Sequence, residues 1–147
     1  MKPALTLATL LLATAATAAH AMPGAGASTP HGAAAATVPV KKVAKATGPD
    51  ARTVAEVVAG KAALKGKPVL VRAQVVKVTS GIMGKNWVHL QDGSGKAADG
   101  THNVIATTKD TVAVGDVVNA KGTVRTDVNI GAGYSYAVLI EDAVLRK

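Results

Sequence analysis

Residues 86–95 read NWVHLQDGSG, and this stretch decides the fold. In its first six residues the apolar side chains of Val88 and Leu90 alternate with others, which predicts a half-buried β-strand. The residues of the opposite face are Trp87, His89 and Gln91. The last four residues, DGSG, favour a turn that ends the strand. The centre of the chain is therefore expected to form β-sheet.

Four other segments show the same alternation and are separated by turn residues. They are residues 69–75, 103–108, 117–125 and 134–140. The pair Val75 and Val76 interrupts the alternation, as a β-bulge or bend does. Five short strands close together predict a small closed barrel, because an open sheet would leave its edges exposed.

A short helix is expected before the first strand. Thr53 and Glu56 have the spacing of a capping box, in which each side chain accepts a hydrogen bond from the other residue's backbone N–H. Val54 and Val57 then follow at helical spacing, and Gly60 provides a stop. The predicted fold class is all-β: a small five-stranded closed barrel preceded by one short helix.

The chain divides into three predicted parts. Residues 1–21 combine Lys2, an apolar stretch and a final Ala-His-Ala, the pattern of a cleaved signal peptide. Residues 22–50 are rich in Ala, Gly, Pro, Ser and Thr and carry a basic cluster, which predicts a flexible low-complexity linker. Residues 51–147 form the domain. We expect a periplasmic or secreted monomer that is not inserted in a membrane after removal of the signal peptide.

Composition excludes several kinds of chemistry. The 147 residues contain no cysteine, so there is no disulfide, no thiolate metal site and no cysteine nucleophile. None of the familiar hydrolase, metalloprotease, phosphate-loop or dinucleotide motifs occurs, and we expect no enzymatic activity. The 17 Lys and Arg outnumber the 9 Asp and Glu, for a formal net charge of +8. Such a balance serves either solubility or the binding of a polyanion.

Several blocks of the sequence resemble the small exported bacterial OB-fold proteins. These blocks are residues 86–93, residues 114–118 (VGDVV), residues 122–124 (GTV), and the segment that runs from GYSY at 133–136 to IED at 140–142. Residues 81–89, GIMGKNWVH, resemble the signature of one exported subfamily. The resemblance covers about residues 53–144. It implies that the predicted barrel is a five-stranded OB-fold barrel preceded by one short helix. Members of the family are often described as binding nucleic acid or nucleotides by analogy of fold.

The resemblance also implies where a ligand would bind. In OB folds the usual surface is the outer face of strands 2 and 3 with the neighbouring loops. On that plan Trp87 and His89 point outward and contribute most to a shared ligand patch. The full set of candidate ligand-binding residues is Met83, Lys85, Trp87, His89, Gln91, Lys121, Arg125, Tyr134 and Tyr136.

The first functional hypothesis is the binding of a nucleic acid or another oligoanion. Bases would stack on Trp87 and a tyrosine, and Lys85, Lys121 and Arg125 would lie near phosphates. Such binding would weaken steeply with added salt.

Two alternatives from other classes stay open. Met83 and His89 offer a thioether and an imidazole, ligands that suit copper(I), and Trp87 is close enough in sequence for a cation–π contact. A small periplasmic copper chaperone with an OB fold is similar in using Met, His and Trp together, although this domain has one Met where that protein has two. The same patch would also serve as a docking site for a protein partner or an exported oligosaccharide.

Overall fold

The computed structural model describes residues 38–147. The predicted signal peptide, residues 1–21, and residues 22–37 of the predicted linker lie outside this range. The elements in chain order are α1 (Val54–Ala59), α2 (Lys61–Leu64), β1 (Pro68–Ile82), β2 (Lys85–Gln91), the 3-10 turn η1 (Ala97–Asp99), β3 (Val104–Thr108), β4 (Val117–Gly131) and β5 (Tyr134–Arg146). Within the described range, no helix is long and apolar enough to span a bilayer.

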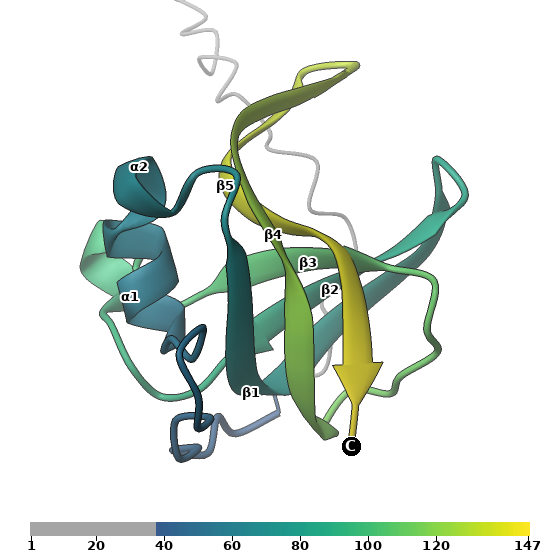
Figure 1. Cartoon of the computed structure of the whole chain (residues 1–147). Coiled ribbons are helices and arrows are strands. Elements are labelled where there is room, and N and C mark those ends of the chain that lie inside the picture. The colour runs from purple at the N-terminus through teal and green to yellow at the C-terminus, as the bar shows by residue number, and fades with distance from the viewer. Residues whose placement is uncertain (1–37) are drawn as a thin grey trace, which may run out of the picture. The chain divides into compact units, whose positions relative to one another are not determined.

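The five strands form one sheet that closes into a ring in the order β1-β2-β3-β5-β4, with β4 returning to β1 (Figure 1). All neighbouring strands are antiparallel except β3 and β5, which pair in parallel through residues 105–106 and 139–140. The all-β class and the five predicted strands are therefore confirmed. A closed sheet leaves no unpaired strand edge along its closed part.

The core lies inside the ring and is built from the alternating apolar residues. Val69, Val71 and Ala73 of β1 point inward, as do Val88 and Leu90 of β2, and all five are fully buried. Val54 and Val57 of α1 join the same cluster. The strands are held together by small and β-branched side chains, consistent with a sequence that contains no Phe.

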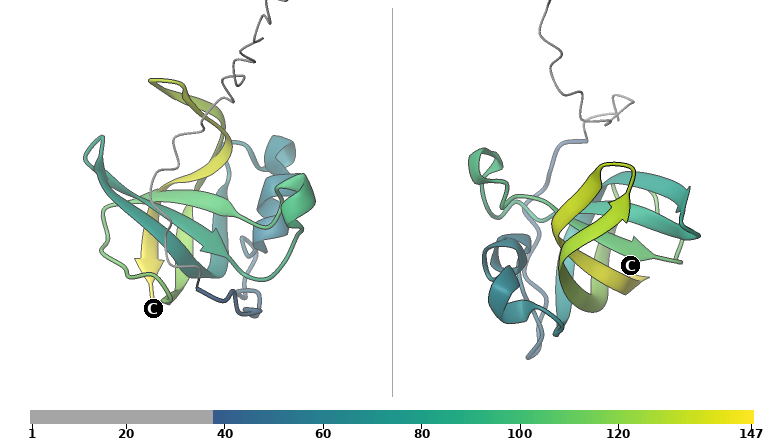
Figure 2. Two further views of the ribbon diagram at one scale, coloured as in Figure 1. Left: turned by 180° about the vertical axis from the view of Figure 1, so that it is seen from behind. Right: turned by 90° about the horizontal axis from the view of Figure 1, so that it is seen from above.

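Three strands run further than the sequence predicts. β1 continues past the expected bulge, which is confirmed as a register shift between Val75 and Lys77, and ends at Ile82. β4 continues to Gly131, and β5 continues past residue 140 to Arg146. Residues 126–138 of these two strands form a hairpin that pairs only with itself. We call residues 126–138 the β4–β5 arm. Figures 1 and 2 show this arm leaving the closed part of the sheet and bending over it.

Helix α1 is held by the turn that follows β2. The predicted capping box is present, because the Thr53 hydroxyl accepts from the N–H of Glu56 and the Glu56 carboxylate accepts from the N–H of Thr53. A carboxylate oxygen of Asp92, a residue only 2% exposed, accepts the N–H of Val54 at 2.9 Å. Ser94 Oγ accepts the N–H of Ala55 at 3.0 Å. The DGSG turn thus caps the helix as well as ending the strand.

The last part of the predicted flexible linker lies against the ring. The N–H of Lys41 donates to the side-chain oxygen of buried Gln74, and the N–H of Val43 donates to the carbonyl of Asp92, both at 2.9 Å. Lys45 forms an ion pair with Glu56 at 2.8 Å. The linker was expected to extend to residue 50, but contacts with the domain begin at residue 41, because backbone hydrogen bonds fix a segment that has few apolar side chains.

Candidate functional site

Trp87 lies on the outer face of β2, as its place in the alternation predicts, but it does not project into solvent. Its residue is only 6% exposed, and its indole N–H donates to the carbonyl of Ile82 at 3.1 Å. The ring of Tyr136 covers it, with the two ring centroids 5.1 Å apart and the planes tilted by 31°. The prediction of an exposed indole is therefore wrong, because the β4–β5 arm folds over this face of the sheet.

The arm has one apolar face, which points toward Trp87. Val128 and Tyr136 are directly paired across the arm, and Ile130 follows two residues after Val128 on the same side. Burial raises the pKa of the Tyr136 hydroxyl. A cavity of about 120 Å³ remains between the arm and the sheet. Its lining residues are Met83, Lys85, Trp87, Thr107, Val128, Ile130, Leu139 and Glu141.

The other predicted aromatic and polar residues surround this region without forming one patch. Tyr134 is exposed at the tip of the arm, whereas Tyr136 is half-buried. Gln91 is half-buried at the other end of β2, where its amide lies 3.5 Å from the side-chain oxygen of Asn103. His89 is half-buried, and its Nδ1 lies 3.4 Å from the amide nitrogen of Asn103.

The two predicted copper ligands do not come together. Met83 is 69% exposed in the turn between β1 and β2, and His89 lies well inside β2. A strand rises about 3.3 Å per residue, so the four steps from Lys85 to His89 alone span about 13 Å. Metal–ligand bonds are about 2 Å long, and one ion cannot bridge that separation. Among residues 38–147, no three His, Asp or Glu side chains gather as a metal site either.

Two of the three predicted phosphate contacts are already engaged. Lys85 Nζ lies 2.5 Å from Asp142 Oδ1, and Arg125 Nε lies 2.7 Å from Glu141 Oε2. Lys121 forms no ion pair with any other residue of the described range 38–147. Ion pairing of two cations leaves less free positive charge near Trp87 than the sequence suggested.

Free positive charge gathers instead on the outer face of β1, β4 and β5, which lie side by side (Figure 1). Arg72 pairs with Asn119, and Asn119 pairs with Arg146, so one row crosses all three strands. Lys121 lies two residues from Asn119 on the same side and is diagonal to both arginines. Diagonal neighbours in a sheet are about 7 to 8 Å apart. We call Arg72, Lys121 and Arg146 the cationic face.

No member of the cationic face forms an ion pair with a carboxylate of residues 38–147. All three side chains are exposed, and the ion pairs formed within residues 38–147 involve other cations: Lys45, Lys85, Arg125 and Lys147. Lys147, which follows Arg146, forms an ion pair with Asp116, the residue before β4, and its hydrogen bond lowers the pKa of Asp116. Lys41 lies near this end of the cationic face, because its backbone N–H donates to the side chain of Gln74, two residues along β1 from Arg72.

Sequence reasoning missed Arg72 and Arg146. The alternation of β1 indicated that Arg72 points away from the core, but it did not predict which residues of other strands lie beside Arg72. The neighbours of Arg72 across β4 and β5 depend on the order and register of three strands that are distant in sequence. Of the predicted ligand residues, Lys121 is the one that the register places in the cationic face.

Comparison with known proteins gives no relative. No protein-family model matches the chain, and no curated protein resembles it closely enough to count as related.

Proposed function

We propose that this protein is an exported, non-enzymatic binding module with an OB fold, and that it binds a linear polyanion across the cationic face. The strand order supports the fold, since an OB fold is a five-stranded Greek-key barrel and β3 and β5 here pair in parallel between antiparallel neighbours. Export to the periplasm or medium is supported by the signal-peptide pattern of residues 1–21.

One observation carries the choice of ligand. Arg72, Lys121 and Arg146 form a triangle of like charges about 7 to 10 Å apart on one sheet surface, with no carboxylate among them. Like charges at this spacing repel, because they lie within about one Debye length of each other at physiological salt. A polyanion removes that repulsion and releases its own counterions on binding.

The geometry favours backbone binding over base stacking. Trp87 is covered by Tyr136 and its N–H is already donated, so a nucleobase has no free indole face to stack on unless the arm moves. The cationic face itself contains no aromatic side chain. The polyanion is therefore recognised by its charge spacing rather than by a base sequence.

The test is a binding titration with a fluorescein-labelled single-stranded oligonucleotide, followed by anisotropy. The triple variant combines Arg72→Gln, Lys121→Gln and Arg146→Gln. Each lost phosphate contact lowers the exponent of the salt dependence by about 0.7, so three lost contacts lower it by about 2. At about 0.1 M salt we therefore expect the affinity to fall about 100-fold. The control variant replaces Lys61, Lys77 and Lys96 by Gln. These three cations lie on α2, on the β1–β2 hairpin and in the β2–β3 loop.

The control lowers the net charge by the same three units and is expected to retain most of the affinity. Equal losses in the two triple variants would show that only net charge matters and would contradict a binding surface on β1, β4 and β5. Tight binding unaffected by either change would also contradict it.

A further inference from the structure

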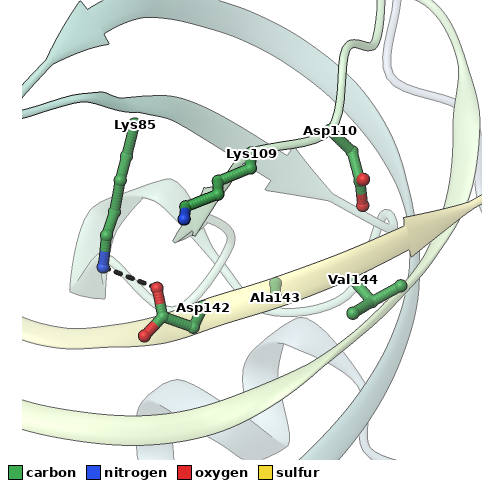
Figure 3. A pocket seen from close by; sticks show the side chains of 6 residues that line it. All are labelled: Lys85, Lys109, Asp110, Asp142, Ala143 and Val144. Carbon is green, nitrogen blue, oxygen red and sulfur yellow. Dashed lines mark hydrogen bonds and ion pairs between the residues drawn. The ribbon is translucent and has the colours of Figure 1, made fainter.

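A pocket of mixed charge adjoins the cationic face. It has a volume of about 420 Å³ and is lined by Lys85, Lys109, Asp110, Asp142, Ala143 and Val144 (Figure 3). Val144 is also the direct partner of Lys121 across β5 and β4, so the pocket begins where the cationic face ends. A chain that crosses the cationic face at Lys121 therefore reaches this pocket next.

Hydrogen bonds position both aspartates of the pocket, Asp110 through its carboxylate and Asp142 through its backbone. Asp110 Oδ2 accepts the N–H of Leu145 at 2.7 Å, and the carbonyl of Asp110 accepts from the side chain of Asn86 at 3.0 Å. Asp142 has a φ of 49°, in the left-handed region, and its N–H donates to Thr107 Oγ1 at 3.1 Å. The Asp110 carboxylate and the Asp142 backbone are therefore positioned before any ligand arrives.

The charges of the pocket balance to zero, two lysines against two aspartates. Figure 3 shows Lys109 pointing toward the Lys85–Asp142 ion pair, with Asp110 on the other side of the pocket. Among the described ion pairs, none includes Lys109 or Asp110. The pocket thus offers an ammonium that lacks a carboxylate partner and carboxylate oxygens that accept hydrogen bonds.

A deoxyribose phosphate backbone suits this pocket poorly. It presents acceptors and negative charge but no hydroxyl donors, so the oxygens of Asp110 and Asp142 would receive no hydrogen bond from it. A sugar acid suits it well. Its carboxylate pairs with Lys109, its hydroxyls donate to Asp110 and Asp142, and its C–H surface packs on Val144, which is 47% exposed.

We propose that the polyanion is a polysaccharide containing uronic acids, and that one of its sugar-acid units occupies the pocket between Lys109 and Asp110. This inference rests on the proposed binding of a polyanion to the cationic face. It adds the class of that polyanion and a second contact that a nucleic acid would not use.

The experiment compares two ligands by isothermal titration calorimetry: a short oligogalacturonate and a single-stranded DNA oligonucleotide of similar charge. The key variant is Asp110→Asn, whose amide oxygen can still accept the N–H of Leu145 while the second acceptor is lost. We expect the affinity for oligogalacturonate to fall about tenfold, which corresponds to the loss of one hydrogen bond to a charged group. The affinity for the oligonucleotide should stay unchanged or rise, because a negative charge is removed.

A second variant, Asp142→Asn, keeps the proposal testable if Asp110→Asn does not fold. Asn tolerates the left-handed backbone of residue 142, so this variant should fold. It is expected to lower oligogalacturonate affinity as well. Lys109→Gln should weaken the oligogalacturonate in the same way, and methyl esterification of the sugar carboxylates should abolish its binding.

The two proposals fail in different ways. If neither ligand binds the wild-type protein, the polyanion function itself is wrong. If the oligonucleotide binds but Asp110→Asn and Asp142→Asn raise the affinity for both ligands equally, the aspartates act only as negative charges and the sugar-acid pocket is refuted.

Discussion

The environment of Trp87 is set by one neighbouring side chain. Tyr136 covers the indole, and the Ile82 carbonyl accepts its N–H, so the only Trp in the chain reports directly on the position of the β4–β5 arm. Its burial is due to the arm and not to the interior of the ring, because Val88 next to it points into the core and Trp87 points the other way.

Tyr136→Ala is therefore expected to expose the indole. The fluorescence maximum of Trp87 should move to longer wavelength, and the free energy of unfolding should fall by about 1–2 kcal/mol, since a half-buried aromatic ring is lost. Tyr136→Phe keeps the ring and should leave the emission unchanged. An unshifted emission maximum in Tyr136→Ala would mean that the arm does not cover Trp87 in solution.

Glu56 links the N-terminal segment to the first helix, and its titration can be measured. The hydrogen bond from Lys45 is the main cause that holds the pKa of Glu56 below its ordinary value of 4.5, with the N–H of Thr53 adding to it. Because the folded-state pKa is the lower one, the stabilisation by this carboxylate is complete above about pH 4.5. It is lost as the pH falls through the folded-state pKa.

We expect Glu56→Gln to be less stable than the wild type at pH 7 and the difference to vanish below the folded-state pKa of Glu56. Thermal melts of both proteins between pH 7 and pH 3 measure this. A difference that stays constant over the whole range would show that the Glu56 carboxylate is not the titrating group.

At the scale of elements, the turn after β2 does more than end a strand. Asp92 and Ser94 accept the first N–H groups of α1, so the helix is joined to the ring by two hydrogen bonds in addition to its apolar contacts. Asp92 is buried, and removal of its side chain leaves the N–H of Val54 without a partner. A buried donor without an acceptor costs free energy.

Asp92→Ala is accordingly expected to lower the free energy of unfolding by about 2 kcal/mol, the combined effect of a lost cap and an unsatisfied N–H. Urea denaturation followed by circular dichroism measures it. The matched control is Asp99→Ala, which removes an exposed carboxylate bonded to Thr101 in the same loop and should change stability little. Similar losses in both variants would contradict the capping role of Asp92.

The sequence predicted the elements better than their extensions. Alternation along β1 and β2 reflects burial on one side of a strand, a property of neighbouring residues, and it located five strands and the bulge at Val76. The fold-back of the β4–β5 arm depends on contacts between Tyr136 and Trp87, which lie in strands far apart along the chain. Such contacts leave no periodic signal.

At the scale of the whole molecule, the distribution of charge determines what the protein can bind. The formal net charge of +8 serves either solubility or the binding of a polyanion, and ion pairs with Asp142 and Glu141 remove Lys85 and Arg125 from the free cations. Which cations remain free depends on strand register. Composition therefore left the binding of a polyanion open, and it could not locate the cationic face that we propose for it.

The salt dependence of oligonucleotide binding shows whether the cationic face contacts the polyanion. We predict that the slope of log affinity against log salt concentration is shallower by about 2 in the Arg72→Gln, Lys121→Gln, Arg146→Gln variant than in the wild type, because three phosphate contacts of about 0.7 each are lost. Identical slopes for the wild type and this variant would contradict the assignment of the polyanion to the outer face of β1, β4 and β5.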